Sequence, residues 1–211
     1  MGTAFEQRSP IINNARLKMY RQPARVLRPE DVHLLLKHVE DQRHHERNRV
    51  IILLSFRAGL RACEISGLQW PMVLATDHRL GDVLTITGSI AKMGSGRRIP
   101  VHKELKRALS VLHRVSDRPA TGFVIQSQRG GKMTPDSIVN WFAALYRELG
   151  LNGCSSHSGR RTFITRTARL LAKTGGSLRD VQELAGHRAL TTTERYIAGD
   201  RDAQRRLIAL I

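Results

Sequence analysis

Several features are scarce in this chain of 211 residues, and each scarcity excludes a class of protein. The two cysteines, Cys63 and Cys154, provide neither a disulfide framework nor a cysteine zinc site, and they suit a reducing compartment. The longest apolar run, Val50 to Phe56, is interrupted by Ser55 and falls well short of the roughly 20 residues that cross a bilayer. The first ten residues, MGTAFEQRSP, lack the apolar stretch of a secretion signal. We therefore expect a cytosolic protein without a membrane-spanning segment.

Acidic residues are also few relative to basic ones. The chain has 35 Lys plus Arg against 18 Asp plus Glu, which gives a formal net charge of +17. Such an excess favours a polyanionic partner whose counterions are released on binding, and nucleic acid is the best candidate. Membrane lipid is a weaker candidate because the basic residues are spread along the chain rather than gathered on one amphipathic helix.

The hydropathy pattern predicts a basic arm over residues 1–26 and one domain over 27–211. Its fold class is predicted to be α+β, mostly α, with a small antiparallel sheet near residues 82–102, where VLTIT and RRIPVH flank the glycine-rich turn KMGSG. FVIQS (123–127) is predicted as a further strand. Helices are predicted from Pro29, over 48–57 with a stop at Gly59, after Leu60, over 134–149, 157–172, 178–184 and 191–197, and over the last ten residues.

The sequence offers no convincing site for a nucleotide or a metal. GGKM (130–133) resembles the end of a phosphate-binding loop, but Gln126 and Met133 stand where that motif needs Gly and Ser or Thr. The histidines between 33 and 45 are not spaced to put three ligands on one helix face. The acidic residues are too scattered for a two-metal nuclease. We therefore expect neither a cofactor nor a metal.

Five short segments in a fixed order contain arginine, lysine, histidine and tyrosine residues that could carry chemistry. They are GLRACEI with Arg61 and Glu64, the turn with Lys92, HSGRRTF with His157 and Arg160, LAGH ending at His187, and TTTERYI with Tyr196. His157 and Arg160 are three residues apart, and Tyr196 follows His187 by nine, with Thr193 three residues before it. Each segment alone is commonplace, so the order and spacing carry the information.

Together these segments resemble the catalytic domain of the tyrosine recombinase, or phage integrase, family, over roughly residues 25–211. The resemblance implies that the enzyme cleaves and rejoins DNA through a covalent 3′-phosphotyrosine, without metal or ATP, for integration, excision or inversion. It implies action on double-stranded DNA by a homotetramer in the bacterial cytosol or nucleoid, with accessory DNA-bending proteins in some reactions.

The resemblance also implies a role for each residue. Tyr196 would attack phosphorus, and Arg61 and Arg160 would stabilise the charge on the phosphate oxygens. His157 would accept a proton or a hydrogen bond, and His187 would hold another phosphate oxygen. Lys92 would protonate the departing 5′-oxygen. Glu64 would orient Arg61, while contacts to DNA are expected from Arg97, Arg98 and Arg161.

Three departures from the family pattern leave alternatives open. Only about 25 residues precede the catalytic segment, too few for the helical clamp domain that recombinases usually carry. The chain is therefore either a naturally short member, similar to the single-domain recombinases that invert fimbrial promoter switches, or a remnant of a longer protein. Gly159 stands where the family often has Leu, which suggests either a close approach to DNA or simple tolerance. Arg161, where the family has His or Arg, is a mild variation.

The functional alternatives are a DNA-binding accessory or regulatory protein that kept the fold and lost turnover, and, with less support, a type IB topoisomerase. The tail DRDAQRRLIALI (200–211) has two equally weighted interpretations. It packs on its own domain, or it docks on a neighbouring protomer and couples active sites.

Overall fold

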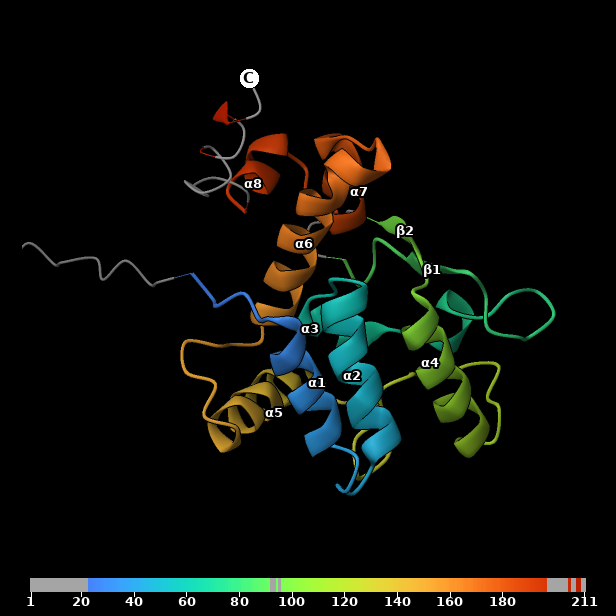
Figure 1. Cartoon of the computed structure of the whole chain (residues 1–211). Helices are drawn as coiled ribbons and strands as arrows, with labels where there is room; N and C mark the ends of the chain where they lie inside the picture. The colour runs from blue at the N-terminus through green and yellow to red at the C-terminus, as the bar shows by residue number, and fades with distance from the viewer. Residues whose placement is uncertain (1–22, 92–93, 95, 197–204, 206–207, 210–211) are drawn as a thin grey trace, which may run out of the picture.

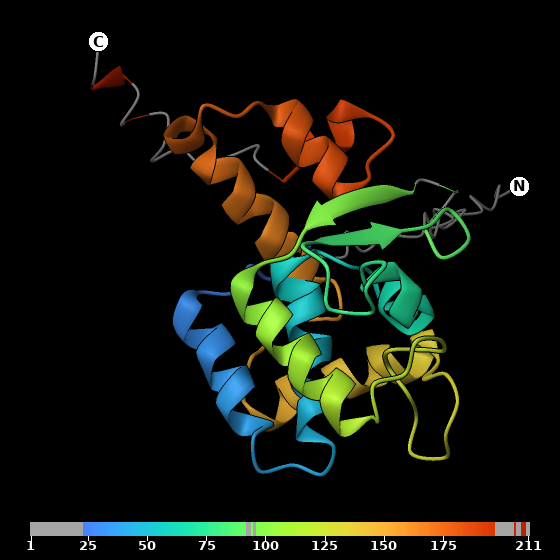
Figure 2. The ribbon, with the colours of Figure 1, turned by 90° about the vertical axis from the view of Figure 1, so that its right-hand side faces the viewer.

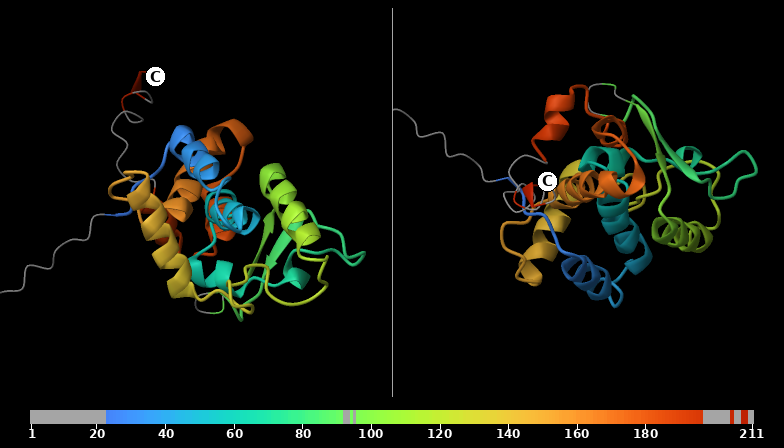
Figure 3. Two further views of the ribbon diagram at one scale, coloured as in Figure 1. Left: turned by 90° about the horizontal axis from the view of Figure 1, so that it is seen from below. Right: turned by 45° about the horizontal axis from the view of Figure 1, so that its top comes forward.

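Helix α2 (His45–Arg57) forms the centre of the fold in the computed structural model, which describes residues 23–91, 94, 96–196, 205 and 208–209. The apolar run that begins at Val50 is the reason, because all five side chains from Val50 to Leu54 are fully buried. Helices α1 (Pro29–His38), α4 (Lys103–Val115) and α6 (Ser158–Thr174) pack against α2. Seen from below, α2 lies between α1, α4 and α5 (Pro135–Glu148) (Figure 3).

Local sequence signals explain where several helices begin and end. Pro29 occupies the first turn of α1, where its missing N–H costs nothing. Thr134 caps α5, since its hydroxyl accepts a hydrogen bond from the Ser137 backbone N–H at 3.1 Å. Helix α7 (Leu178–Ala185) ends at Gly186, which adopts a left-handed conformation with φ of 63°.

A two-stranded antiparallel sheet pairs β1 (Val83–Ile86) with β2 (Arg97–Pro100) (Figure 1). Leu84 is opposite Ile99, and both are buried, whereas Thr85 and its partner Arg98 are exposed. The hairpin therefore has one face on the core and one on the surface, as the alternating pattern predicts. The predicted sheet near 82–102 and the mostly helical α+β fold class are confirmed.

The C-terminal half of α6 and helix α7 stand above the rest of the molecule, with β2 directly beneath α7 (Figure 2). A second, small hydrophobic cluster joins them, built on Ile164, Val181 and Ala185. Helix α8 (Leu190–Glu194) packs on α7 and is followed by Tyr196. His187 and Tyr196 belong to this upper part.

The segment before α1 is tied to the start of α6. The Arg25 backbone N–H donates to the Gly153 carbonyl at 3.0 Å, and the Leu27 N–H donates to the Thr162 hydroxyl at 2.9 Å. Leu27 and Thr162 are both buried, so these bonds are shielded from water. The N-terminal end of the domain thereby helps to fix the helix that carries Arg160.

One prediction of local structure is wrong, and two elements were not predicted. No strand forms over 123–127, because the two ends of this segment pair with different parts of the chain. Phe123 forms an isolated bridge to Gln69, and Gln126 forms one to Lys132. The sequence analysis also missed α4 and the short 3₁₀ helix η1 (Trp70–Met72). Helix α4 buries Leu105, Leu109 and Leu112, whose spacing is helical. The other predicted helices over 29–197 are present within a few residues, although α8 is shorter than 191–197.

Some predictions fall outside the described residues. They concern residues 1–22 of the arm predicted over 1–26, Lys92, and most of the C-terminal tail with its predicted helix and docking role. Within the described part of the chain, no helix has the length and apolar character needed to cross a membrane. The same part contains no cluster of three or more His, Cys, Asp or Glu side chains arranged to bind a metal ion.

Candidate active site

Arg61 and Glu64 are placed by a sharp turn between α2 and the short helix α3 (Ala62–Gly67). Gly59 makes the turn with φ of 64°, and a Cβ atom there would lie 2.4 Å from the Phe163 ring of α6. Glycine is thus required both for the backbone conformation and for the approach of α6. Arg61 immediately precedes α3, and its backbone N–H donates to Glu64 Oε2 at 2.8 Å.

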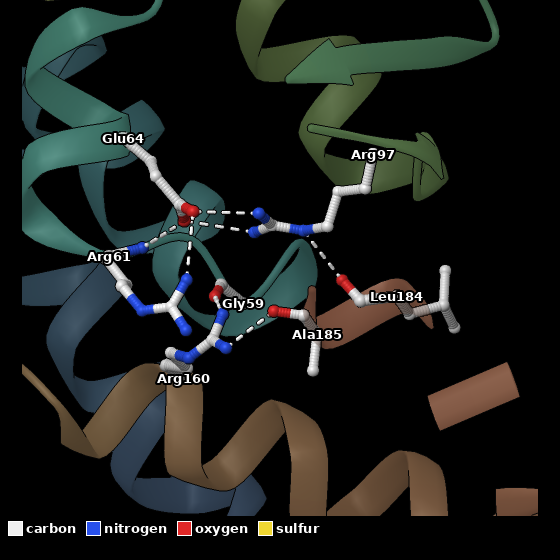
Figure 4. Close-up of polar contacts among 7 residues, drawn as sticks. All are labelled: Gly59, Arg61, Glu64, Arg97, Arg160, Leu184 and Ala185. Atoms are coloured by element: carbon white, nitrogen blue, oxygen red, sulfur yellow. Dashed lines mark hydrogen bonds and ion pairs between the residues drawn. The ribbon is translucent and has the colours of Figure 1, made fainter. Parts of the chain in front are cut away.

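Glu64 is fully buried and accepts hydrogen bonds from two arginines (Figure 4). Arg97 binds it with both terminal nitrogens, at 2.8 and 3.0 Å, and Arg61 Nη1 lies 3.1 Å from Oε1. Burial alone would raise the pKa of the Glu64 carboxyl, but the hydrogen bonds and charge of Arg97, together with Arg61, hold that pKa below its ordinary value. Glu64 is therefore ionised, and it binds Arg97 as well as Arg61.

Arg97 occupies a different place from the predicted one. Its side chain is 5% exposed and spans from β2 to Glu64, while its Nε donates to the Leu184 carbonyl at 2.9 Å. All three guanidinium nitrogens thus donate to protein acceptors, and the expectation that Arg97 binds DNA needs correction. Arg98, the next residue, is exposed on the outer face of the hairpin.

Arg160 is presented by the first turn of α6 and is 3% exposed. Its two terminal nitrogens donate to the carbonyls of Gly59 and Ala185, at 2.7 and 2.6 Å (Figure 4). Burial and the neighbouring charge of Arg61 lower the pKa of Arg160 to about 10. The guanidinium remains charged at neutral pH, in a fixed orientation and with its charge little screened by water.

Gly159 is needed to bring Arg160 into place. A Cβ atom at this position would lie 2.1 Å from the hydroxyl oxygen of Ser55 and 2.8 Å from its Cβ. Helix α6 therefore crosses α2 closely, with Gly159 at the contact. Gly159 serves helix packing in this structure, which is neither of the two explanations offered by the sequence.

His187 follows the left-handed Gly186 and is almost entirely buried. Its Nδ1 lies 2.9 Å from the Thr193 hydroxyl, which is fully buried on α8. The Gln182 amide donates to the His187 carbonyl at 2.9 Å and so holds the loop. Burial and the charges of Arg160 and Arg61 lower the pKa of His187 to about 4, so the imidazole is neutral at pH 7.

Tyr196 is half-buried beside His187, in the turn that ends α8. The two rings are stacked, with centroids 5.6 Å apart and planes inclined by 21°. The Arg161 guanidinium carbon lies 5.6 Å from the centre of the Tyr196 ring, within the range of a cation–π contact. The Tyr196 backbone N–H donates to the Thr193 carbonyl at 3.0 Å, which ties the tyrosine to the residue that orients His187.

The structure thus brings together Arg61, Glu64, Arg160, His187 and Tyr196, with Arg161 against the tyrosine. His157 is exposed at the N-terminal cap of α6, where its backbone N–H donates to the Ser155 hydroxyl at 3.3 Å.

The sequence analysis gave no role to Thr193 and did not identify Gln182. It also missed the pairing of Arg97 with Glu64. A signal for that pairing existed, because Arg97 and Ile99 are two residues apart on a strand and so share the inward face.

Comparison with known proteins gives a consistent result. The sequence profile described as the Phage integrase family matches residues 25–202. The tyrosine recombinase XerC of Mesorhizobium japonicum is 32% identical over 211 residues, covering 93% of this chain and 64% of the relative. XerC of Bradyrhizobium diazoefficiens is 32% identical over 160 residues, covering 73% and 46%. The chain therefore spans about half to two thirds of the length of these relatives.

Solved structures share the fold. The Tn1549 transposon integrase, in complex with transposon right end DNA, has a TM-score of 0.69 at 21% identity, covering 88% of this chain and 65% of the integrase chain. The XerA recombinase has a TM-score of 0.69 at 18% identity, covering 88% and 64%.

Proposed function

The chain belongs to the phage integrase family, and from this premise we propose that it is a site-specific tyrosine recombinase. It would cleave and rejoin double-stranded DNA through a covalent 3′-phosphotyrosine at Tyr196. The observation that carries the proposal is the placement of Tyr196 against a neutral His187, at the edge of a group of buried arginines. The XerC relatives, named tyrosine recombinases, support the same activity.

The arginines supply what a phosphodiester needs before it can be attacked. Its non-bridging oxygens repel a nucleophile, and they gain charge in the five-coordinate transition state. Arg160 has more N–H donors than the two backbone carbonyls accept, and those carbonyls fix its orientation. Arg61 is 20% exposed and would be the more accessible of the two to a phosphate oxygen. Together they would hold the phosphate before the reaction starts, so little reorganisation is needed.

Tyr196 would attack phosphorus, forming the Oη–P bond as the bond to the 5′-oxygen breaks. A free tyrosine hydroxyl has a pKa of about 10, so its proton must be taken up and the phenolate stabilised. His157 is the candidate for the first task, and Arg161 over the ring supports the second. Lys92 would return a proton to the 5′-oxygen, an assignment that rests on the sequence resemblance alone.

A neutral His187 would act as a hydrogen-bond donor to the phosphate. Because Nδ1 faces the Thr193 hydroxyl, the other ring nitrogen is the one available to a phosphate oxygen. In the tautomer with the proton on Nε2, Nδ1 accepts from Thr193 and Nε2–H donates. A Thr193 hydroxyl that donates to Nδ1 would thereby stabilise the tautomer that can donate to the phosphate.

Contacts to DNA would come from the exposed face of the hairpin, through Arg98, and from Arg161. The net charge of +17 supports a strong electrostatic contribution to binding. The integrase of Tn1549 was solved with transposon DNA, which supports a double-stranded DNA partner here. A homotetramer on DNA, accessory DNA-bending proteins and a bacterial cytosolic setting belong to the same proposal. The proposed reaction is integration, excision or inversion of DNA.

A covalent trap tests this function and finds the target site. The protein is incubated with fragmented genomic DNA of its source organism, the reaction is stopped with detergent, and the ends attached to protein are sequenced. We expect ends clustered at one short inverted repeat, absent with Tyr196→Phe. DNA binding in a gel shift with no attached ends from the unmutated protein would contradict a recombinase and favour the accessory DNA-binding alternative.

A further inference from the structure

The ion pair of Arg97 with Glu64 connects three parts of the site. Arg97 lies on β2, Glu64 on α3, and the Leu184 carbonyl that accepts from Arg97 Nε lies near the end of α7. The next carbonyl along the chain, that of Ala185, accepts from Arg160. Two successive peptide units thus each accept a hydrogen bond from an arginine of the site (Figure 4).

The distribution of charge at Glu64 suggests why this arrangement matters. Glu64 carries the negative charge of a group that also contains Arg61, Arg97 and Arg160, whose charges are near enough to affect one another. Arg97 binds both carboxylate oxygens, whereas the side chain of Arg61 contacts one. Because the carboxylate is fully buried, water does not compensate a missing partner.

We propose that Arg97 is a positioning residue that neutralises Glu64, so that Arg61 keeps its charge and its remaining N–H donors for the scissile phosphate. The inference rests on the proposed function for its catalytic consequence, but its electrostatic core concerns phosphate binding alone. Without Arg97, the Glu64 carboxylate draws Arg61 more tightly and places an uncompensated negative charge close to the bound phosphate. Both effects weaken the stabilisation of phosphate charge.

Gly186 gives this role a second structural basis. A Cβ atom at Gly186 would lie 2.9 Å from Arg97 Cδ and 3.1 Å from Nη1. The Arg97 side chain therefore passes over the residue that directly precedes His187. The same guanidinium that neutralises Glu64 packs against the turn that presents the histidine.

Two variants separate positioning from folding. Arg97→Met leaves Glu64 buried with half of its bonds lost and is expected to lower stability. The double variant Arg97→Met/Glu64→Gln removes the arginine and the carboxylate charge together, so Arg61 is released rather than captured. Arg49 lies in the first half of α2 and forms part-exposed ion pairs with Glu40 and Glu104, so Arg49→Met is the control for the loss of a paired arginine.

The first measurement follows binding of inorganic phosphate by the arginine side-chain signals in NMR spectra, which needs no turnover. We expect Arg97→Met to weaken phosphate binding roughly tenfold, in the range found for losing one hydrogen bond to a charged group. We expect the double variant to recover most of the loss and Arg49→Met to change nothing. Unchanged phosphate affinity in folded Arg97→Met, or no recovery in the double variant, would overturn the proposal.

The second measurement is the single-turnover cleavage rate at saturating DNA, on a normal substrate and on one with a methyl group replacing a non-bridging oxygen of the scissile phosphate. We expect the defect of Arg97→Met to be large on the charged substrate and small on the neutral one. Equal defects on both substrates would indicate a purely structural role. If the unmutated protein does not cleave, the proposed function fails, and the phosphate measurement still decides the role of Arg97.

Discussion

The imidazole of His187 lies against the phenol ring of Tyr196 at a centroid distance of 5.6 Å, while its Nδ1 faces the buried hydroxyl of Thr193 at 2.9 Å. The backbone of Tyr196 is itself bonded to the Thr193 carbonyl. One threonine therefore contacts both the proposed nucleophile, through its carbonyl, and the histidine beside it, through its hydroxyl. Since Thr193 contacts both His187 and Tyr196 in this way, changes at Thr193 are expected to affect chemistry more than DNA binding.

Thr193→Val tests that expectation, because valine keeps the shape and removes the hydrogen bond. We predict a cleavage rate roughly fivefold to tenfold lower, in line with about 1 kcal/mol for a lost hydrogen bond, and an unchanged affinity for DNA. Thr193→Ser keeps the hydroxyl and is the control, with a rate near that of the unmutated protein. A normal rate for the valine variant would show that the Nδ1 contact does not orient His187.

The lowered pKa of His187 predicts a pH dependence of stability. The pKa is about 4 in the folded protein against 6.5 ordinarily, so the unfolded chain binds the proton more readily between these values. Stability from this group is complete above pH 6.5 and is lost as the pH falls toward 4, by about 1–3 kcal/mol. Urea unfolding between pH 4.5 and 7.5 measures it, and His187→Asn is expected to flatten the curve. Parallel curves for the two proteins would refute the assignment.

Gly159→Ala is predicted to destabilise the protein, although the same change in an open helix would stabilise it by about 1 kcal/mol. The reason is the contact with Ser55, which a new methyl group would overlap. We expect a loss of about 1–3 kcal/mol in the free energy of unfolding. Adding Ser55→Gly opens space and should recover part of the loss. A Gly159→Ala variant more stable than the unmutated protein would contradict the close contact of α6 with α2 at Ser55.

Arg98 is predicted to contribute to the salt dependence of DNA binding and Arg97 is not, although they are neighbours on β2. Arg98→Met should reduce the steepness of log K against log salt concentration by about one, as expected for one lost phosphate contact. Arg97→Met/Glu64→Gln should leave that slope unchanged, because the Arg97 guanidinium is bonded inside the protein. The reverse pattern, measured by titration at several salt concentrations, would exchange their roles.

Much of this arrangement could be predicted from the sequence, where local signals and tertiary packing agree. Thr134 and Pro135 mark the start of α5, and the alternation around 82–102 gives the hairpin. The segment 123–127 has the composition of a strand, but it pairs at its two ends with different partners, which its sequence does not encode. Helix α4 buries leucines at helical spacing, so its sequence carries a pattern from which the helix could have been predicted.

Part of the candidate site could be predicted from the sequence, while the hydrogen-bond partners of its arginines could not. Motif spacing selects Arg61, Arg160, His187 and Tyr196, which the fold brings together. Which acceptors hold each arginine depends on contacts across the fold: the Gly59 carbonyl that binds Arg160 is 101 residues away in the chain. The same holds for Arg97, whose bond to Leu184 spans 87 residues.

The most direct test of the central claim is to identify the residue that carries DNA. Complexes trapped on the mapped site are trimmed with nuclease and digested with protease, and the peptides are analysed by mass spectrometry. We predict a nucleotide attached through its 3′-phosphate to the peptide containing Tyr196, and a free 5′-hydroxyl on the released strand. An adduct on another residue, or cleavage that survives Tyr196→Phe, would contradict the assignment of Tyr196 as the nucleophile.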